Sequence, residues 1–290
     1  MTNKNIHLIA DLGGTNIRFG FCDAGTTRIS EIRKYSIRDY ESIDHLLQIY
    51  LEDANTAVDT ISGCCIAVAG PMDNNCVKMT NCDWEITTAA INHSLSISNA
   101  ALINDFHAIA LSANYLESDA LTIIGNQLPS TNKGPVSVFG PGTGLGAALL
   151  IPNKNAAASV IPTEAGHAGL SARTDREQYI FDYWRNKGCR INREFFVSGI
   201  GIERIFEAIC VEQGSDDYRQ LSVAHIQTMG CNNEQPLCEE TMNIFCAFLG
   251  SAAGDQVLCT GSTGGLILAG GILPRFIEFL QKSSFRKRFE

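Results

Sequence analysis

Three glycine clusters, each placed after a short apolar run, are the residues of this sequence best suited to binding phosphate. They are Ala-Asp-Leu-Gly-Gly-Thr-Asn at residues 10–16, Gly-Pro-Gly-Thr-Gly-Leu-Gly at 140–146 and Ala-Gly-Gly-Ile at 269–272. Glycine has no Cβ and adopts positive φ readily, so successive backbone N–H groups can point at phosphate oxygens. A single cluster is equally typical of an ordinary turn, whereas three at strand ends favour a nucleotide site.

Two features narrow the kind of nucleotide site. The chain lacks the Gly-x-x-x-x-Gly-Lys-Ser/Thr pattern of a P-loop. A Rossmann site is also disfavoured, because the pair Gly13 and Gly14 is followed by a strand-like run at residues 17–22 and not by a helix.

Asp105 ends another apolar run, in the segment Ile-Asn-Asp-Phe at residues 103–106. When a hydroxyl attacks a phosphoryl group, a carboxylate within hydrogen-bond reach can accept its proton. Phe106 and Ile109 begin a helical spacing, however, so Asp105 is also well placed to cap a helix. The pattern alone leaves both roles open.

Glu164 and His167 stand three residues apart on an expected loop, after a strand-like run at 158–161 that Pro162 is expected to end. A Glu-x-x-His pair on a helix can form half of a metal site, but one copy with Gly166 inside it disfavours that interpretation. A structural histidine is the alternative. Glu194, four residues before Ser198, is either a functional carboxylate or an exposed helix charge.

Alternating strand-like and helix-like segments must position these residues. Hydrophobic periodicity predicts a meander of three strands, a helix, a buried strand, a second helix and a further buried strand parallel to the first. A second round of two strands and two helices follows. The predicted ranges are 6–10, 17–22, 32–37, 43–51, 64–69 and 101–103, followed by 136–139, 147–151, 202–209 and 239–258. The repeated order suggests two related lobes. The polar stretches 126–134 and 214–236 are expected to be surface loops, and the basic residues 286–288 a solvated helix end.

Composition limits the function classes. The chain has 290 residues, 45% of them hydrophobic, which is enough for one large core or two modest ones. A net charge of −9 disfavours nucleic acid as a partner. The apolar run at 6–10 is stopped by Asp11 and is too short for a signal peptide or a membrane span. Eleven cysteines include no Cys-x-x-Cys pair, so we expect reduced thiols, no zinc site and a cytoplasmic protein.

Together these motifs resemble the bacterial glucokinase family, within the superfamily of sugar kinases, heat-shock chaperones and actin. The resemblance covers nearly the whole chain, and the motifs taken together are specific to this family. Besides the glycine clusters, it rests on Gly-Cys-Cys-Ile-Ala-Val-Ala-Gly-Pro at 63–71, Met-Thr-Asn-Cys-Asp-Trp at 79–84, the pair Asn104–Asp105, Glu-Ala-Gly-His at 164–167, Val-Ser-Gly at 197–199 and Gly-Gly-Ile-Leu-Pro-Arg at 270–275.

The resemblance implies an α/β fold with two lobes, of the actin-like (ribonuclease H-like) ATPase kind, and an active site in the cleft between them. The small lobe would span residues 1–109 and the large lobe 110–290. The implied reaction is the ATP-dependent phosphorylation of glucose to glucose 6-phosphate, a step of glycolysis. Alternatives are a kinase for mannose, fructose or an amino sugar, and a sugar-binding regulatory protein with little turnover.

The resemblance also assigns roles to individual residues. Asp105 is the implied general base. The sugar would be bound by Asn104, Glu164, His167 and Glu194. The nucleotide would be bound by Ala10, Asp11, Leu12, Gly13, Gly14, Thr15, Asn16, Gly142, Thr143, Gly144, Gly270 and Gly271, with the last two on the adenosine side. Asp11 is the implied partner of Mg²⁺ through water. A homodimer without nucleic acid or membrane partners is expected.

One expectation concerns the C-terminus. Members of the family continue past the position of Glu290 with a segment that ends in a helix packed on the first lobe. Without it, a less stable small lobe and reduced activity are expected, since apolar surface there would face water at about 25 cal/mol per Å².

Overall fold

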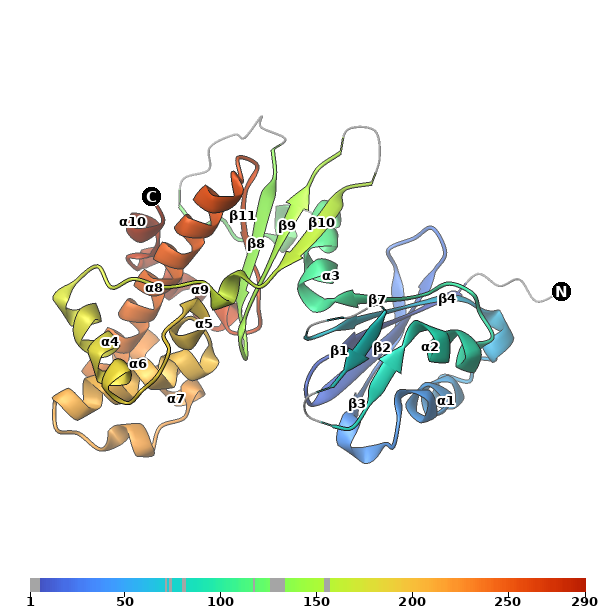
Figure 1. The fold of residues 1–290 in the computed structure, drawn as a ribbon, viewed down its shortest axis with the longest axis horizontal. Coiled ribbons are helices and arrows are strands. Elements are labelled where there is room, and N and C mark those ends of the chain that lie inside the picture. The colour runs from blue at the N-terminus through green and yellow to red at the C-terminus, as the bar shows by residue number, and fades with distance from the viewer. Residues whose placement is uncertain are drawn as a thin grey trace. The chain divides into compact units, whose positions relative to one another are not determined.

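The computed structural model describes residues 6–70, 72, 75–79, 82–116, 118–125, 134–153 and 157–290. The chain divides into two compact units, Met1–Ala108 (unit 1) and Ile109–Glu290 (unit 2), and each is described by itself (Figure 1). Pro71, Thr80 and Asn81, which belong to motifs of the family resemblance, lie outside the described residues, as do residues 126–133 of one predicted loop.

Unit 1 is built on a five-stranded sheet with the order β3-β2-β1-β4-β7. The first three strands form the predicted antiparallel meander, and β4 and β7 run parallel to β1. The strands are β1 (Ile6–Leu12), β2 (Asn16–Asp23), β3 (Ile29–Ser36), β4 (Ile61–Val68) and β7 (Ala100–Asn104). A short hairpin of β5 (Cys76–Lys78) and β6 (Glu85–Thr87), which the periodicity did not predict, precedes the last helix of the unit.

Two helices, α1 (Ile43–Asp53) and α2 (Thr88–Leu95), contact each other and cover the sheet of unit 1 (Figure 1). Ser42 and Thr87 cap their N-termini by accepting hydrogen bonds from backbone N–H groups. On α1 the predicted apolar face is buried, and it consists of Ile43, Leu46, Leu47, Tyr50 and Leu51. The ring of Tyr50 is stacked on Phe19 at 4.9 Å between centroids. Short 3₁₀ turns occupy Ile37–Asp39 and Val58–Thr60.

The register of the parallel strands aligns their carboxyl ends. Leu12 of β1 is paired with Val68 of β4, and Val68 is paired with Asn104 of β7. Because neighbouring strands lie about 4.8 Å apart, the turn after β1 and the residue after β7 leave the same edge of the sheet within about two strand spacings.

Unit 2 repeats the beginning of this topology. Its sheet has the order β10-β9-β8-β11, with an antiparallel meander β8-β9-β10 and β11 parallel to β8. The strands are β8 (Val136–Pro141), β9 (Leu145–Ile151), β10 (Ser159–Thr163) and β11 (Gly265–Leu268). The meander followed by a parallel strand is the arrangement of β1, β2, β3 and β4, so the repeat suggested by the segment order is present in the topology.

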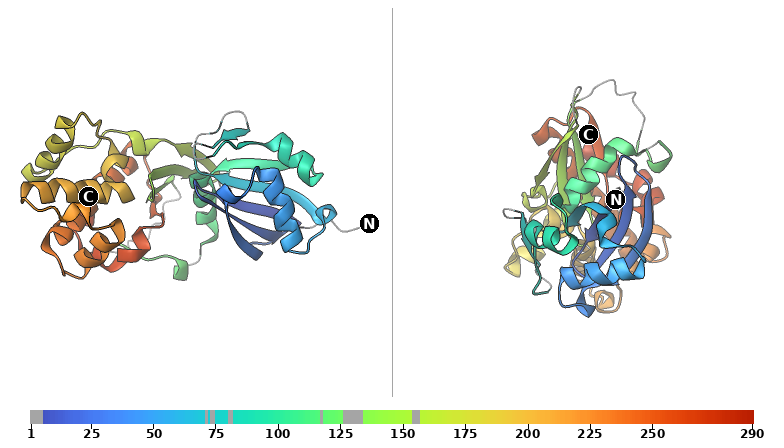
Figure 2. Two further views of the ribbon diagram at one scale, coloured as in Figure 1. Left: turned by 90° about the horizontal axis from the view of Figure 1, so that it is seen from below. Right: turned by 90° about the vertical axis from the view of Figure 1, so that its right-hand side faces the viewer.

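The helices of unit 2 gather around α8 (yellow to red in Figure 2). They are α4 (Asp175–Asn186), α5 (Arg193–Phe196), α6 (Gly199–Glu212), α7 (Val223–Cys231), α8 (Pro236–Thr260), α9 (Ile277–Lys282) and α10 (Phe285–Phe289); α3 (Asp105–Ser112) joins the two units. Single 3₁₀ turns lie at Ala113–Tyr115, Ser118–Ala120, Ala165–His167 (η5), Asp217–Arg219 and Leu273–Phe276.

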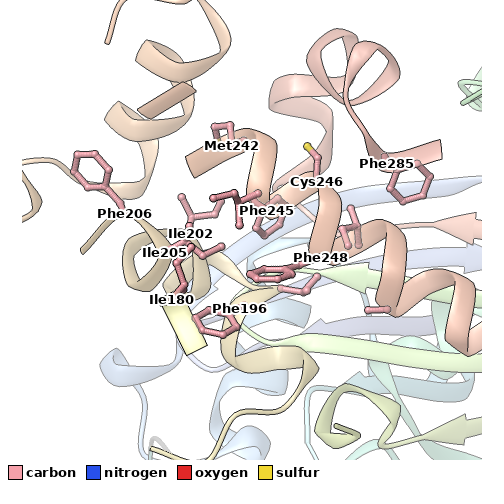
Figure 3. Packing of buried hydrophobic residues seen from close by; sticks show 14 of the residues in the cluster. Ile180, Phe196, Ile202, Ile205, Phe206, Met242, Phe245, Cys246, Phe248 and Phe285 are labelled. Carbon is pink, nitrogen blue, oxygen red and sulfur yellow. The ribbon is translucent and has the colours of Figure 1, made fainter. Parts of the chain in front are cut away.

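The long helix α8 is the centre of the unit 2 core (Figure 3). Its predicted stripe of apolar residues is fully buried: Met242, Phe245, Cys246, Leu249 and Ala253. Among the described helices, α8 alone is long and apolar enough to cross a membrane, but 67% of its most apolar window is buried inside the protein. Packing in the core therefore accounts for its apolar character.

Three predictions about unit 2 were wrong. Residues 214–236 are not a plain loop, because Ser222 caps α7 and Ile226 packs into the core. Pro162 does not end the strand before it, since β10 lies at the sheet edge, where a missing N–H is tolerated. Arg288 is not a solvated helix end, because its guanidinium pairs with the buried carboxylate of Glu177.

Candidate active site

The helix after β7 is capped by Asn104 and not by Asp105. Asn104 Oδ1 accepts hydrogen bonds from the backbone N–H groups of Phe106 (2.9 Å) and His107 (3.2 Å), which is N-cap geometry. Asp105 is the first residue of α3, and its Oδ1 accepts from Phe106 N at 2.8 Å. The capping role that the sequence left open for Asp105 therefore belongs to its neighbour.

This cap places the Asp105 carboxylate in the first turn of α3, where the helix dipole favours negative charge. Burial lowers the pKa of His107, so this imidazole is neutral at neutral pH and adds no cation to the helix start. Oδ1 of Asn104 already accepts two hydrogen bonds from the start of α3. The side chain can therefore bind a ligand by donating from its NH₂ group.

The first glycine turn joins β1 to β2 at the same sheet edge. Gly13 N donates to Asn16 O at 3.0 Å and closes the hairpin. A Cβ at Gly13 would meet only Asn16 O, at 3.7 Å, so the other side of the turn is open for close approach to the backbone. Gly13 does not have the positive φ expected for glycines in a phosphate-binding turn. Glycine is useful here because it has no side chain and leaves space beside the backbone.

Asp11 lies beside Arg18, its cross-strand partner on β2. Oδ2 of Asp11 is 3.4 Å from Nη1 of Arg18, and both side chains are about 60% exposed. A pair this exposed is weak. In the described part of the chain no group of three or more His, Cys, Asp or Glu side chains is arranged to hold a metal ion, so Asp11 is a single carboxylate and not part of a cage.

The second glycine turn joins β8 to β9 and is held by the carboxylate of Glu194. Oε2 of Glu194 accepts a hydrogen bond from Leu145 N at 2.8 Å. A Cβ at Gly144 would overlap this carboxylate and displace it from the turn, whereas a Cβ at Gly142 would meet nothing within 4 Å. A second support comes from the first residue of α6, because Gly199 N donates to Gly142 O at 2.9 Å.

The third glycine turn packs directly on the second. Gly270 has φ of +100°, and a Cβ there would overlap Pro141 O at the end of β8. Ala269 N donates to Phe139 O at 3.0 Å, which extends the parallel pairing of β11 and β8. The glycine clusters at 140–146 and 269–272 are therefore adjacent at the carboxyl ends of two neighbouring strands.

Glu164 and His167 are joined by the 3₁₀ turn η5 after β10. Their side chains face each other, with Nε2 of His167 3.8 Å from Oε2 of Glu164, and both are largely exposed. The turn sits against β9, because a Cβ at Gly166 would overlap Leu145 O. Leu145 thus contacts the turn through its carbonyl and Glu194 through its N–H.

Two residues that the sequence analysis did not select support this turn. Asn192 contacts the ring of His167, with Nδ2 at 3.3 Å from Nδ1. Arg193 is 5% exposed, and its Nη1 donates to Ala165 O (3.4 Å) and to Gln256 Oε1 (3.3 Å). In the sequence, only their position next to Glu194 could have indicated this role. A single asparagine at a helix start and a single arginine are common and indicate no function.

The most deeply buried cysteines are poorly suited to nucleophilic chemistry. All eleven cysteines are free, as expected from the sequence. Burial raises the pKa of both the Cys64 and the Cys246 thiol to about 12, so these thiols stay protonated and are poor nucleophiles.

The predicted residues therefore form two groups. Unit 1 carries the first glycine turn, Asn104 and Asp105 at one sheet edge. Unit 2 brings together the other two glycine turns and Glu194, and places η5 against the same strand, β9. The backbone of the glycine turns is accessible to a ligand, and the neighbouring carboxylates and amides can pair with hydroxyl groups. This combination suits the transfer of a phosphoryl group to a polyol.

Comparison with known sequences gives the family. The family model described as Glucokinase matches residues 8–290. The glucokinase of Colwellia psychrerythraea is 35% identical over 289 residues, which cover 98% of this chain and 86% of that protein.

Solved structures agree. A glucokinase from an Antarctic psychrotroph matches with a TM-score of 0.84 at 33% identity, over 98% of this chain and 88% of the other. A glucokinase of the ROK family from Streptomyces griseus, solved with glucose and AMPPNP, shares the fold with a TM-score of 0.66 at 16% identity, over 98% of this chain and 89% of the other. The predicted α/β fold is confirmed by these matches. The chain belongs to the glucokinase family.

Proposed function

We propose that this protein transfers the γ-phosphoryl group of ATP to the 6-hydroxyl of glucose. One observation carries the proposal: Glu194, the predicted sugar contact, is hydrogen-bonded to the backbone of the predicted phosphate turn at Leu145. A sugar held by this carboxylate lies beside the phosphates held by residues 142–144. Such proximity of acceptor and donor is what phosphoryl transfer requires.

The glycine turns fit a nucleotide. Side-chain-free backbone at Gly13 and Gly142 leaves room for phosphate oxygens to reach N–H groups. Gly270 and Gly271 would lie on the adenosine side, next to the end of β8. When bound, ATP supplies the transferable phosphoryl group, and support for ATP comes from the AMPPNP in the Streptomyces griseus enzyme.

Asp105 is the proposed general base. As the sugar oxygen forms its bond to phosphorus, its proton passes to the Asp105 carboxylate, the bond to the bridging oxygen breaks and ADP leaves. The amide hydrogens of Asn104 donate to the sugar, as its oxygen caps α3. Glu164, His167 and Glu194 pair with the remaining hydroxyls, because a hydroxyl left unpaired in a dry site costs about 1–3 kcal/mol.

Mg²⁺ is proposed as the cofactor, with Asp11 holding it through water. A single exposed carboxylate fits this role, since Mg²⁺ keeps several waters and takes its other ligands from phosphates. A cytoplasmic homodimer is proposed from the family resemblance, and the free cysteines support a reducing compartment.

A coupled assay of ADP release tests the function. Glucose, mannose, fructose and N-acetylglucosamine are compared at equal concentration, with and without Mg²⁺. The proposal predicts the highest kcat/KM for glucose. Turnover that prefers another hexose would change the assigned substrate, and ATP binding without turnover of any sugar would contradict the kinase assignment.

A further inference from the structure

The side chain of Asn192 contacts two groups at once. Its Oδ1 accepts from Phe195 N at 2.8 Å as the N-cap of α5, and its Nδ2 lies 3.3 Å from His167 Nδ1. Because the Phe195 N–H group is a donor, the atom of Asn192 that faces it must be the oxygen. The cap therefore turns the NH₂ group toward the histidine ring. An NH₂ group only donates, so Nδ1 of His167 must present its lone pair.

That orientation puts the proton of a neutral ring on Nε2. Nε2 lies 3.8 Å from Glu164 Oε2, which is too far for a direct hydrogen bond. A hydroxyl placed against both atoms accepts from Nε2–H and donates to the carboxylate, so every group is satisfied. With the proton on Nδ1 instead, both atoms facing the hydroxyl would be acceptors, and one would stay unpaired.

We propose that Asn192 is a positioning residue that holds His167 in the Nε2–H tautomer, so that His167 and Glu164 together recognise one hydroxyl of the sugar. The inference rests on the proposed glucose kinase activity. The charged groups on the elements packed at this turn are Glu164 itself, Arg193 and Glu194 on α5, and Asp255 on α8, whose Oδ2 is 4.0 Å from Arg193 Nη2.

The variant Asn192→Asp isolates this role. Aspartate caps a helix as well as asparagine does, so one carboxylate oxygen still accepts from Phe195 N and the fold is kept. The second oxygen faces His167 Nδ1 as an acceptor and attracts the proton to that nitrogen. The Nε2 atom of the neutral ring then loses its hydrogen, and one partner of the sugar hydroxyl is lost.

The first measurement is the tautomer itself. Long-range ¹H–¹⁵N correlation spectra of the ¹⁵N-labelled full chain distinguish protonated from unprotonated ring nitrogens, with His167→Gln to assign the signals. At a pH where the ring is neutral, we expect the proton on Nε2 in the wild type and on Nδ1 in Asn192→Asp. A proton on Nδ1 in the wild type, or the same tautomer in both proteins, overturns the inference whatever the activity.

The second measurement is glucose affinity by calorimetry, without nucleotide, from about pH 5.5 to about pH 9. In Asn192→Asp the protonated ring still carries Nε2–H, and the hydrogen is lost as the ring deprotonates. Affinity for glucose should therefore weaken with rising pH by roughly 5- to 150-fold relative to the wild type, the effect of one unpaired polar group. The wild-type ring keeps Nε2–H as it deprotonates, so its affinity should show no such loss with rising pH. A parallel pH profile in the two proteins contradicts the inference.

Ser222 provides a matched control in the same unit. It caps α7, and its Oγ lies 3.0 Å from Nδ1 of His225, so a capping side chain again faces a histidine ring, at residues with no proposed contact to the sugar. Ser222→Asp should leave the pH profile of glucose affinity unchanged. Asn192→Ser, which keeps a cap but not the reach to His167, should weaken glucose binding without the step in pH. If the wild type does not turn over glucose at all, the proposed function fails, while the tautomer measurement still decides the role of Asn192.

Discussion

Several side chains in this protein have structural roles that cannot be inferred from their residue types. Asn104 and Asp105 are both good N-cap residues, and the hydrogen bonds to Phe106 and His107 give the cap to Asn104. Glu194 has the sequence context of an exposed helix charge, yet its carboxylate holds the turn at Gly144. The chemistry proposed for each residue therefore depends on whether it or a neighbouring residue makes the structural hydrogen bonds.

Asp105→Asn should lower kcat by roughly 10²- to 10⁴-fold, because the amide cannot accept the proton of the attacking hydroxyl. Steady-state kinetics check the loss, and calorimetry should show that glucose still binds. Thermal stability should hardly change, since Asn104 keeps the cap. Asn104→Ala is the matched control for capping, with an expected loss of about 1 kcal/mol of folding stability. Near wild-type turnover in Asp105→Asn would rule out Asp105 as the base.

Substitutions of Glu194 should separate its two contacts. Glu194→Ala removes the acceptor of Leu145 N and should lower kcat/KM for glucose by roughly 5- to 150-fold while also raising the KM for ATP. In Glu194→Gln the amide oxygen can still accept from Leu145 N, so the KM for ATP should stay close to that of the wild type while glucose kinetics worsen. An unchanged KM for ATP in the alanine variant would show that the turn does not need this carboxylate.

At the scale of elements, strand register does most of the positioning. The parallel pairing of β1, β4 and β7 aligns the first glycine turn with Asn104, and that of β8 and β11 brings the other two turns into contact. Side-chain support comes from the segment Asn192–Arg193–Glu194, whose three residues contact His167, Ala165 and Leu145 in order. The start of the short helix α5 therefore connects η5, which carries the predicted sugar contacts, to the predicted phosphate-binding turn at residues 142–144.

Gly270→Ala should destabilise unit 2 by about 1–3 kcal/mol. The position has φ of +100°, and the added Cβ would overlap the backbone oxygen of Pro141, which cannot move without disturbing β8. Gly271→Ala is the adjacent control, because a Cβ there meets nothing within 4 Å, and its stability should stay within about 0.5 kcal/mol of the wild type. Urea denaturation compares the two, and equal losses would show that the overlap is relieved at little cost.

At the scale of the whole molecule, the chain has two hydrophobic cores with no residue in common among the described side chains. Each unit also contains one tryptophan, Trp84 in unit 1 and Trp184 in unit 2. The core of unit 2 is closed by a buried ion pair, in which Arg288 of α10 donates to both carboxylate oxygens of Glu177 on α4, at 3.0 and 3.1 Å.

Glu177→Gln should cost about 3–5 kcal/mol, because it leaves the largely buried Arg288 without its counter-charge. Denaturation is followed by fluorescence in Trp84→Phe and Trp184→Phe backgrounds, so that each remaining tryptophan reports one unit. The transition reported by Trp184 should shift more than that reported by Trp84. Asp182→Asn, which breaks an exposed pair with Arg185 on α4, should cost less than about 1 kcal/mol. Equal shifts at both tryptophans would mean that the two units unfold as one.

The sequence by itself located most strands of the two sheets, the helices α1, α6 and α8, and the positions of the glycine turns. Local periodicity located the meander of unit 1 and the buried stripe of α8, because side-chain spacing directly reflects which face is buried. It missed α7, whose polar surroundings hide the burial of Ile226. The family resemblance supplied the roles of Asp105, Glu164, His167 and Glu194.

Only the tertiary structure decided which atoms of those residues are used. The bond from Leu145 to Glu194 and the contact of Asn192 with His167 join residues 49 and 25 positions apart. The cap by Asn104 is local, but the pattern of residue types does not distinguish it from a cap by Asp105. Hydrogen bonds are short-ranged and directional, so a shift of one residue in register would replace every partner. A sequence pattern carries no such information, because it specifies which residues are buried and not which donors and acceptors meet.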